Sequence, residues 1–246
     1  MDLNSFQPLA FPGASLDRGD GHYVLRMVEP LQFLSSATLG EGLLRTQWVL
    51  SYQVEATICL PRPAEYLRER ARRLDMPEEL FIGLLTAVNH RDLQVYTEQK
   101  AGVTVTTLAT VGADHGSRPG QQRYGQGECV PVDLAWMRNS DPAILEPGTI
   151  NIVTLIDADL TAGALVRAST MATEAKTLAL VEAGIKTKEG YLATGTATDV
   201  TVVGHTGRGL HCPYAGSATL VGSLVGRGAY HVVRQGLEVS QRRDYS

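Results

Sequence analysis

The chain has 246 residues, 43% of them hydrophobic and 20% charged, a composition that indicates a folded globular protein and excludes disordered and collagen-like chains. Its formal net charge of −4 offers no positive field to a nucleic-acid backbone, so we expect no nucleic-acid binding. The three cysteines, Cys59, Cys129 and Cys212, form no CxxC pair, which favours a reducing, cytoplasmic setting over a disulfide framework or a zinc site.

The N-terminal part of the chain predicts strands. We expect residues 1–22 to be loosely ordered. The apolar segment 23–35 is interrupted by Pro30, which predicts two short strands joined by a bend. The stretch 47–60 is rich in Val, Ile and Leu and predicts a further strand.

Two helices and a hairpin are predicted next. Residues 63–74 form a charged amphipathic pattern that begins with a proline, and residues 77–88 predict a second helix. The segments 93–98 and 103–111 predict strands joined by a short Gln-Lys-Ala-Gly turn. Residues 112–148 then lose all periodicity, and an irregular segment of that length is often functional.

The C-terminal part alternates between strand and helix. Residues 149–156 predict a buried strand, 157–160 a turn, and 161–183 a long helix with Thr161 as N-cap and Gly184 as its stop. A strand at 199–204 and a last helix at about 217–235 follow, with a frayed end at 240–246. Because Arg227 and His231 interrupt the most apolar stretch, we expect no membrane insertion. The pattern as a whole predicts a mixed α+β fold with central β-sheets flanked by helices.

Familiar catalytic signatures are absent from the sequence. It contains no GxxxxGK[ST] phosphate loop, no HExxH helix and no GxSxG elbow, and its six histidines are scattered. We therefore expect neither a metal site nor a nucleotide-binding site.

Three segments carry more polar residues than a core requires. Thr149 and Asn151 interrupt the start of an apolar strand, and the segment 193–199 combines three threonines with Asp199. On the helix 161–183, Thr170, Thr173, Glu174 and Thr177 fall at helical spacing. Each segment also has a structural interpretation, because a polar stripe on a helix is usually solvated and threonines at a strand entry often cap backbone groups.

Five stretches of the sequence together resemble the adenosylcobinamide amidohydrolases of corrinoid salvage. In chain order they are LSSATLGEG at 34–42, GLLTAV at 83–88, GTINIVTLIDADLTAGALVRASTMATEAKTLAL at 148–180, ATGTATDVTVVG at 193–204 and YAGSATLVGSLVGRG at 214–228. The TEAKT and TGTxTD pieces, joined by this spacing, are the most specific. The chain departs from the family pattern at Glu41, His115 and Gln121.

The resemblance implies one domain over residues 1–246 that hydrolyses the amide between the corrin ring's propionate and aminopropanol. It implies a corrinoid substrate, no cofactor, and a site that draws its residues from the matching stretches and the long loop. Catalytic candidates are Thr149, Asp199 and Glu174. Substrate-binding candidates are Ser35, Ser36, Asn151, Thr194, Thr196, Thr198, His115 and Arg118.

A second similarity suggests a mechanism. Gly148-Thr149 before a buried strand, an Asp-Ala turn and a long helix is similar to the catalytic start of the aminopeptidase and ornithine acetyltransferase group. That similarity implies an αββα sandwich in which self-cleavage frees Thr149 as a nucleophile with its own amine as base. Alternatively, an uncleaved Thr149 binds substrate while Asp199 or Glu174 activates water.

The sequence also suggests two other functions. The departures at Glu41, His115 and Gln121 suggest a corrinoid-binding protein without hydrolysis, and the Gly148-Thr149 pattern suggests an amidase or aminopeptidase for another small amide. The small-residue helix at 215–229 allows close packing, either on a partner helix in a homo-oligomer or on the chain's own sheet.

Overall fold

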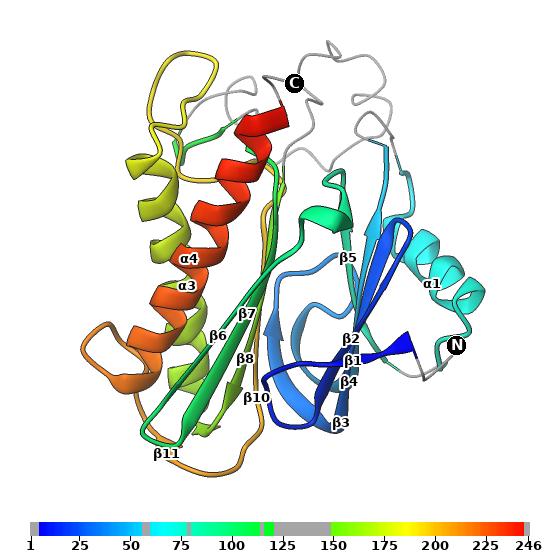
Figure 1. Cartoon of the computed structure of the whole chain (residues 1–246), viewed down its shortest axis with the longest axis vertical. Helices are drawn as coiled ribbons and strands as arrows, with labels where there is room; N and C mark the ends of the chain where they lie inside the picture. The colour runs from blue at the N-terminus through cyan, green and yellow to red at the C-terminus, as the bar shows by residue number, and fades with distance from the viewer. Residues whose placement is uncertain (1–4, 56–59, 78–79, 114–115, 121–148, 244–246) are drawn as a thin grey trace.

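The computed structural model describes residues 5–55, 60–77, 80–113, 116–120 and 149–243 (Figure 1). The longer strands are β2 (Ala14–Gly19), β3 (His22–Ser35), β4 (Gly42–Gln53), β5 (Ile82–Thr86), β6 (Gln94–Lys100), β7 (Val103–Val111), β8 (Ile150–Asp157) and β10 (Val200–His205). Short strands are β1 (Gln7–Pro8), β9 (Asp159–Leu160) and β11 (His211–Cys212). The helices are α1 (Pro63–Arg73), the 3-10 turn η2 (His90–Asp92), α3 (Ala162–Glu182) and α4 (Leu220–Arg243).

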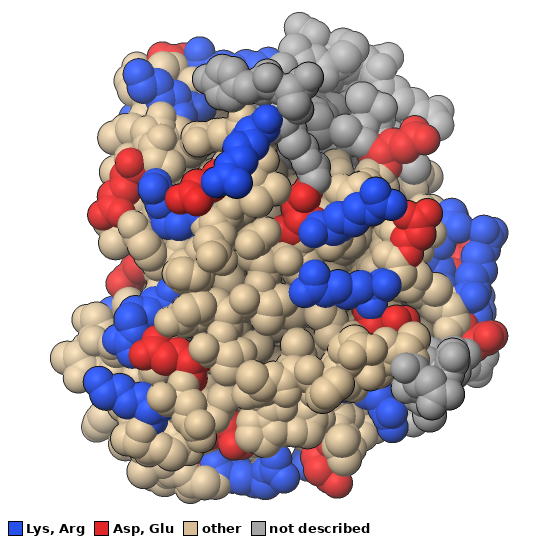
Figure 2. All heavy atoms as spheres, viewed as in Figure 1, with Lys and Arg blue, Asp and Glu red and all other residues tan. Residues whose placement is uncertain are grey.

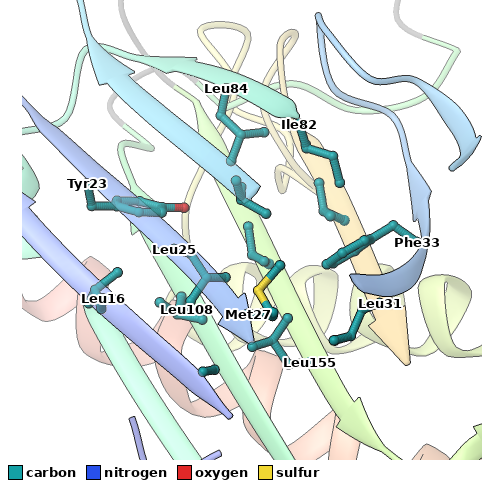
Figure 3. Packing of buried hydrophobic residues seen from close by; sticks show 14 of the residues in the cluster. Leu16, Tyr23, Leu25, Met27, Leu31, Phe33, Ile82, Leu84, Leu108 and Leu155 are labelled. Carbon is teal, nitrogen blue, oxygen red and sulfur yellow. The ribbon is translucent and has the colours of Figure 1, made fainter. Parts of the chain in front are cut away.

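One hydrogen-bonded sheet of nine strands forms the centre of the molecule. Its order is β1-β2-β3-β10-β8-β7-β6, and β4 pairs with both β3 and β5. Figure 3 shows side chains of β2, β3 and β5 packed against Leu108 of β7 and Leu155 of β8. Because strands far apart in the order share one buried cluster, the sheet curls until its two halves face each other. The predicted mixed α+β class is confirmed.

Helices cover both outer faces of this curled sheet (Figure 1). Apolar residues of α3 and α4 pack on the half made of β6, β7, β8 and β10, and Leu67 and Ala71 of α1 pack on the other half. The layers are therefore helix, sheet, sheet and helix, as in an αββα sandwich, but the antiparallel β3–β10 pairing joins both sheet layers. At this junction the ring of Phe33 occupies the space where a side chain at Gly204 would lie.

The long helix α3 begins and ends as its sequence predicts. The hydroxyl of Thr161 accepts a hydrogen bond from the Ala164 N–H at 3.1 Å, so Thr161 is the N-cap. Gly184 has a φ of +69° just after the helix, a conformation that glycine adopts readily. The strand predictions at 103–111 and 149–156 are likewise confirmed to within one residue.

The predicted helix at 77–88 is wrong, because residues 82–86 form β5 instead. This strand lies parallel to β4 and is buried almost throughout, so it is a short continuous apolar run. Such a run shows no alternation that would separate a strand from a buried helix.

The N-terminal expectations also change. Residues 23–35 form one strand, β3, whose pairing with β4 shifts register between Arg26 and Leu31, where Pro30 is tolerated at the irregularity. The strand expected at 47–60 runs over Gly42–Gln53. The segment expected to be loose contains β1 and β2, and β2 pairs with β3 along its whole length.

The C-terminal boundaries differ in smaller ways. Part of the expected turn at 157–160 is β9, which pairs in parallel with β11. The last helix begins at Leu220 and continues to Arg243, beyond the predicted end. Two of its glycines face the chain's own sheet, since Gly228 lies against Thr107 and Gly236 against Val111. In the described residues, no helix combines the length and hydropathy that a membrane crossing requires.

Candidate active site

The candidate site lies where β8 and β10 begin. These strands are parallel neighbours, and Val200 pairs with Asn151, so their first residues lie at the same edge of the sheet. The Ile150 N–H donates to Asp199 Oδ1 at 3.0 Å, and the Thr149 hydroxyl donates to the Thr198 carbonyl at 2.9 Å. The polar segments 149–151 and 193–199 therefore meet directly.

The carboxylate of Asp199 is saturated with donors. Oδ1 accepts from the Ile150 N–H and the Thr196 hydroxyl, and Oδ2 accepts from the Thr196 N–H at 3.0 Å and from the Lys176 ammonium. A carboxylate that accepts a pair of hydrogen bonds on each oxygen is held in one orientation. Asp199 is thus built to position its neighbours and has little capacity left to take a proton from water.

Lys176 also belongs to this site, although its sequence context predicts a surface charge. Its side chain is 8% exposed and contacts Asp199, whose side chain is 12% exposed. The signal was present in the helical period, because Lys176 follows buried Ala172 by four residues and precedes buried Leu180 by four. A lysine on the buried face of a helix requires an anionic partner, and Asp199 is that partner.

Thr149 and Asn151 face the interior between the two sheet layers. Asn151 lies on the same face of β8 as Val153 and Leu155, which belong to the inter-sheet core. Thr149, the residue just before the strand, follows the same alternation. The Thr149 hydroxyl lies 3.3 Å from Asn151 Oδ1 in addition to its contact with the Thr198 carbonyl. The proton of Thr149 is therefore directed toward two acceptors.

The Asn151 amide joins β8 to the far end of the curled sheet. Its Nδ2 donates to the Leu85 carbonyl of β5 at 2.7 Å, and the side chain is buried. Thr110 of β7 pairs with Asn151, and its buried hydroxyl has no hydrogen-bond partner among the residues that the structure describes. This hydroxyl lies on the strand next to Asn151, inside the same buried layer.

The loop 193–199 is fixed on both sides. Thr177 of α3 donates its hydroxyl to the Thr194 carbonyl at 3.1 Å, and the Ser117 N–H donates to the Gly195 carbonyl at 2.7 Å. A Cβ at Gly195 would lie 2.5 Å from Asp199 Oδ2 and 2.9 Å from Lys176 Nζ. A side chain at position 195 would therefore displace one of these two charged groups.

Other predicted site residues do not join this group. Glu174 is exposed on α3 and binds Arg167 at 3.0 Å, and Arg118 is exposed with its guanidinium 4.7 Å from the centre of the Tyr191 ring. Ser35 accepts a hydrogen bond from the Ala37 N–H, and Ser36 exchanges backbone and side-chain hydrogen bonds with Thr201. His115 and Gln121 lie outside the described residues, and Glu41 is exposed.

Charge elsewhere on the molecule is mixed. On the face shown in Figure 2, positive and negative side chains are interspersed. One pair of this kind is Arg227 of α4, which donates two hydrogen bonds, at 2.7 and 2.8 Å, to Glu98 of β6. No three His, Cys, Asp or Glu side chains converge as metal ligands within the described ranges.

Comparison with known proteins gives an extensive match to one family. The sequence profile of the adenosylcobinamide amidohydrolases matches residues 13–244. The adenosylcobinamide amidohydrolase of Methanosarcina mazei is 31% identical over 213 residues, which cover 83% of this chain and 89% of that protein. An uncharacterized protein of Methanocaldococcus jannaschii is 32% identical over 179 residues, or 70% of this chain and 69% of its own.

Among solved structures, a beta-aminopeptidase of a Burkholderia species aligns with a TM-score of 0.45 and 14% identity. The alignment covers 96% of this chain and 82% of that one. A likeness of this degree does not bear on the chemistry of the site.

Proposed function

The chain belongs to the adenosylcobinamide amidohydrolase family, and from this premise we propose that it hydrolyses the amide that links the corrin ring's propionate to aminopropanol. The products are adenosylcobyric acid and the free amino alcohol. The observation that carries the proposal is the match of the family profile to nearly the whole chain. The polar group at the start of β8 and β10 supports it with a site suited to acyl transfer.

We assign the nucleophile to Thr149. The two carboxylates that could instead activate water are poorly placed for that role, because Asp199 is saturated with donors and Glu174 is exposed and bound to Arg167. The Thr149 hydroxyl, by contrast, is held by the Thr198 carbonyl and Asn151. A fixed hydroxyl at the start of a buried strand is a suitable nucleophile if a base is available.

The base in this proposal is the amine of Thr149 itself. Hydrolysis of the Gly148–Thr149 peptide bond adds one water and leaves a carboxylate on Gly148 and an amine on Thr149. The amine accepts the hydroxyl proton as Oγ1 attacks the substrate carbonyl carbon. The C–N bond then breaks, aminopropanol leaves with the proton, and water hydrolyses the ester that remains on Thr149.

The surrounding residues set the geometry of this attack. Asp199 binds the N–H of Ile150, the residue directly after the nucleophile, and Asn151 fixes β8 relative to β5. Thr194, Thr196 and Thr198 belong to the loop that closes the site, so we propose that this loop borders the bound amide. Precise placement of the reacting atoms accounts for a large part of enzymatic rate enhancement.

The test is mass-spectrometric product analysis of purified protein incubated with adenosylcobinamide. We expect adenosylcobyric acid and free aminopropanol from the wild type, and a loss of turnover of at least about two orders of magnitude in Thr149→Ala, because this variant lacks the nucleophile. Thr173→Ala is the matched control, because Thr173 is an exposed threonine of α3 whose hydroxyl donates to the Ser169 carbonyl of the same helix.

The same experiment separates the alternatives. Corrinoid binding without product would indicate a carrier, and turnover of simple amides with indifference to corrinoids would indicate a different amidase.

We propose the cytoplasm as the site of the reaction because the scattered cysteines suit a reducing compartment.

A further inference from the structure

Lys176 is a charged side chain held inside the molecule. Its side chain is 8% exposed, whereas the neighbouring charges of α3, Arg167 and Glu174, are 45% and 51% exposed. Lysine is almost never buried unless it is paired, because removing an ammonium from water is costly. The position of Lys176 therefore depends on its bond to Asp199.

Hydrogen bonds connect the ion pair to the backbone next to Thr149. Asp199 receives the ammonium on Oδ2 and the Ile150 N–H on Oδ1, so one carboxylate separates Lys176 from the residue after Thr149. The next residue on the helix, Thr177, donates to the Thr194 carbonyl. Two adjacent residues of α3 thus hold the loop that carries Asp199.

The backbone at Gly195 packs closely against the Lys176–Asp199 ion pair. A side-chain carbon at Gly195 would contact Asp199 Oδ2 and Lys176 Nζ at distances below 3.0 Å. Gly195 therefore lies directly against both charged groups, whose side chains are 8% and 12% exposed.

We infer that Lys176 is a positioning residue of the amide hydrolysis: its ammonium holds the Asp199 carboxylate against the Ile150 N–H and thereby fixes the Thr149 hydroxyl. The inference rests on the proposed function. Without the ammonium, Asp199 is a buried anion bound only by neutral donors, and such a group draws in water or takes up a proton. Either change weakens the bond to Ile150 and moves Thr149, and a shift of about 1 Å in a reacting group can lower the rate about a hundredfold.

The experiment compares Lys176→Met with Lys100→Met and with the double variant Lys176→Met/Asp199→Asn. Methionine keeps the unbranched stem of Lys176 and removes the charge, and Lys100 is an exposed lysine at the opposite end of the sheet. The measurements are kcat and KM with adenosylcobinamide, the thermal midpoint, and hydrogen exchange of the peptide that contains Ile150.

We expect Lys176→Met to lower kcat by about ten- to a hundredfold with KM changed less than about threefold, and to speed exchange at Ile150. Lys100→Met should match the wild type in every measurement. The double variant removes the unpaired anion, so its thermal midpoint should recover toward that of the wild type while kcat stays low.

Two outcomes overturn the inference. One is a Lys176→Met protein with wild-type kcat and unchanged exchange at Ile150, and the other is a double variant whose kcat recovers together with its stability. A wild-type protein that releases no product overturns the proposed function instead, so the two failures are distinguishable.

Discussion

Asn151 of β8 donates its side-chain amide to the Leu85 carbonyl of β5 at 2.7 Å, although these strands do not pair in the sheet. This bond connects the two sheet layers at the edge where Thr149 lies. Asn151 therefore has two roles, since its carbonyl oxygen also faces the Thr149 hydroxyl at 3.3 Å.

Asn151→Ala should affect stability and turnover together. The change leaves the Leu85 carbonyl without this donor and should lower the free energy of unfolding by about 1–3 kcal/mol, measured by urea denaturation. Turnover should fall by about tenfold or more because the Thr149 hydroxyl loses an orienting acceptor. Unchanged turnover in a folded variant would remove Asn151 from the site.

The integrity of the chain tests the mechanism directly. If the Thr149 amine is the base, active protein on a denaturing gel runs as two fragments, one that ends at Gly148 and one that begins with Thr149. Thr149→Ala should remain a single band, because it lacks the hydroxyl that starts the cleavage. Full activity from intact chains would contradict this mechanism and leave the amide substrate unaffected as a proposal.

Two glycines of α4, one turn apart, should respond in opposite directions to alanine. A Cβ at Gly222 would lie 2.1 Å from the Gly216 carbonyl oxygen, so Gly222→Ala should destabilise the fold by about 1–3 kcal/mol. Gly226 has open space around its Cβ position, so Gly226→Ala should stabilise the fold by about 0.5–1 kcal/mol through helix propensity. Thermal unfolding of the two variants measures both signs, and equal effects would contradict the packing of this helix.

His90 should make the stability depend on pH. Burial lowers the pKa of His90 to about 4 from its usual 6.5, and the Ser51 hydroxyl lies 2.9 Å from its Nε2. Between these two pH values the unfolded chain binds the proton and the folded chain does not. With respect to His90, the free energy of unfolding is therefore highest above pH 6.5. It falls as the pH drops toward 4, by about 3 kcal/mol at most.

Denaturant titrations between pH 4 and 8 measure this dependence, and His90→Gln should flatten it. An equally steep decline in His90→Gln would assign the acid sensitivity to other groups. Glutamine is chosen because its side-chain amide offers a hydrogen-bonding partner to the Ser51 hydroxyl, which is fully buried beside His90.

Local chemistry made part of this fold predictable. The helix α3 begins after Thr161 and ends just before Gly184, as the capping preferences of these two residues predict. The β-branched run at 103–111 forms a strand, also as predicted. The segment at 82–86 was not predictable in this way, because its buried apolar run owes its strand conformation to pairing with β4. Tertiary pairing of that kind leaves no periodic signal.

The candidate site was predictable to the same degree. The approach of Thr149 to the loop 194–199 follows from two adjacent strands that begin together. Lys176 lay beside a run of helical threonines that indicated a solvated face, and only the packing of α3 on β10 shows that its charge points inward. Glu174, two residues earlier, has the opposite orientation for the same reason.

The junction between β3 and β10 has a consequence for how the chain folds. Ser36 and Thr201 are hydrogen-bonded across 165 residues, and the same edge of β3 receives β2 before the register shift and β10 after it. During synthesis, the second half of that edge has no partner until β10 has emerged. Long-range pairing of this kind slows folding and leaves a strand edge open to other chains, so we expect C-terminal truncations to aggregate rather than to accumulate as soluble fragments.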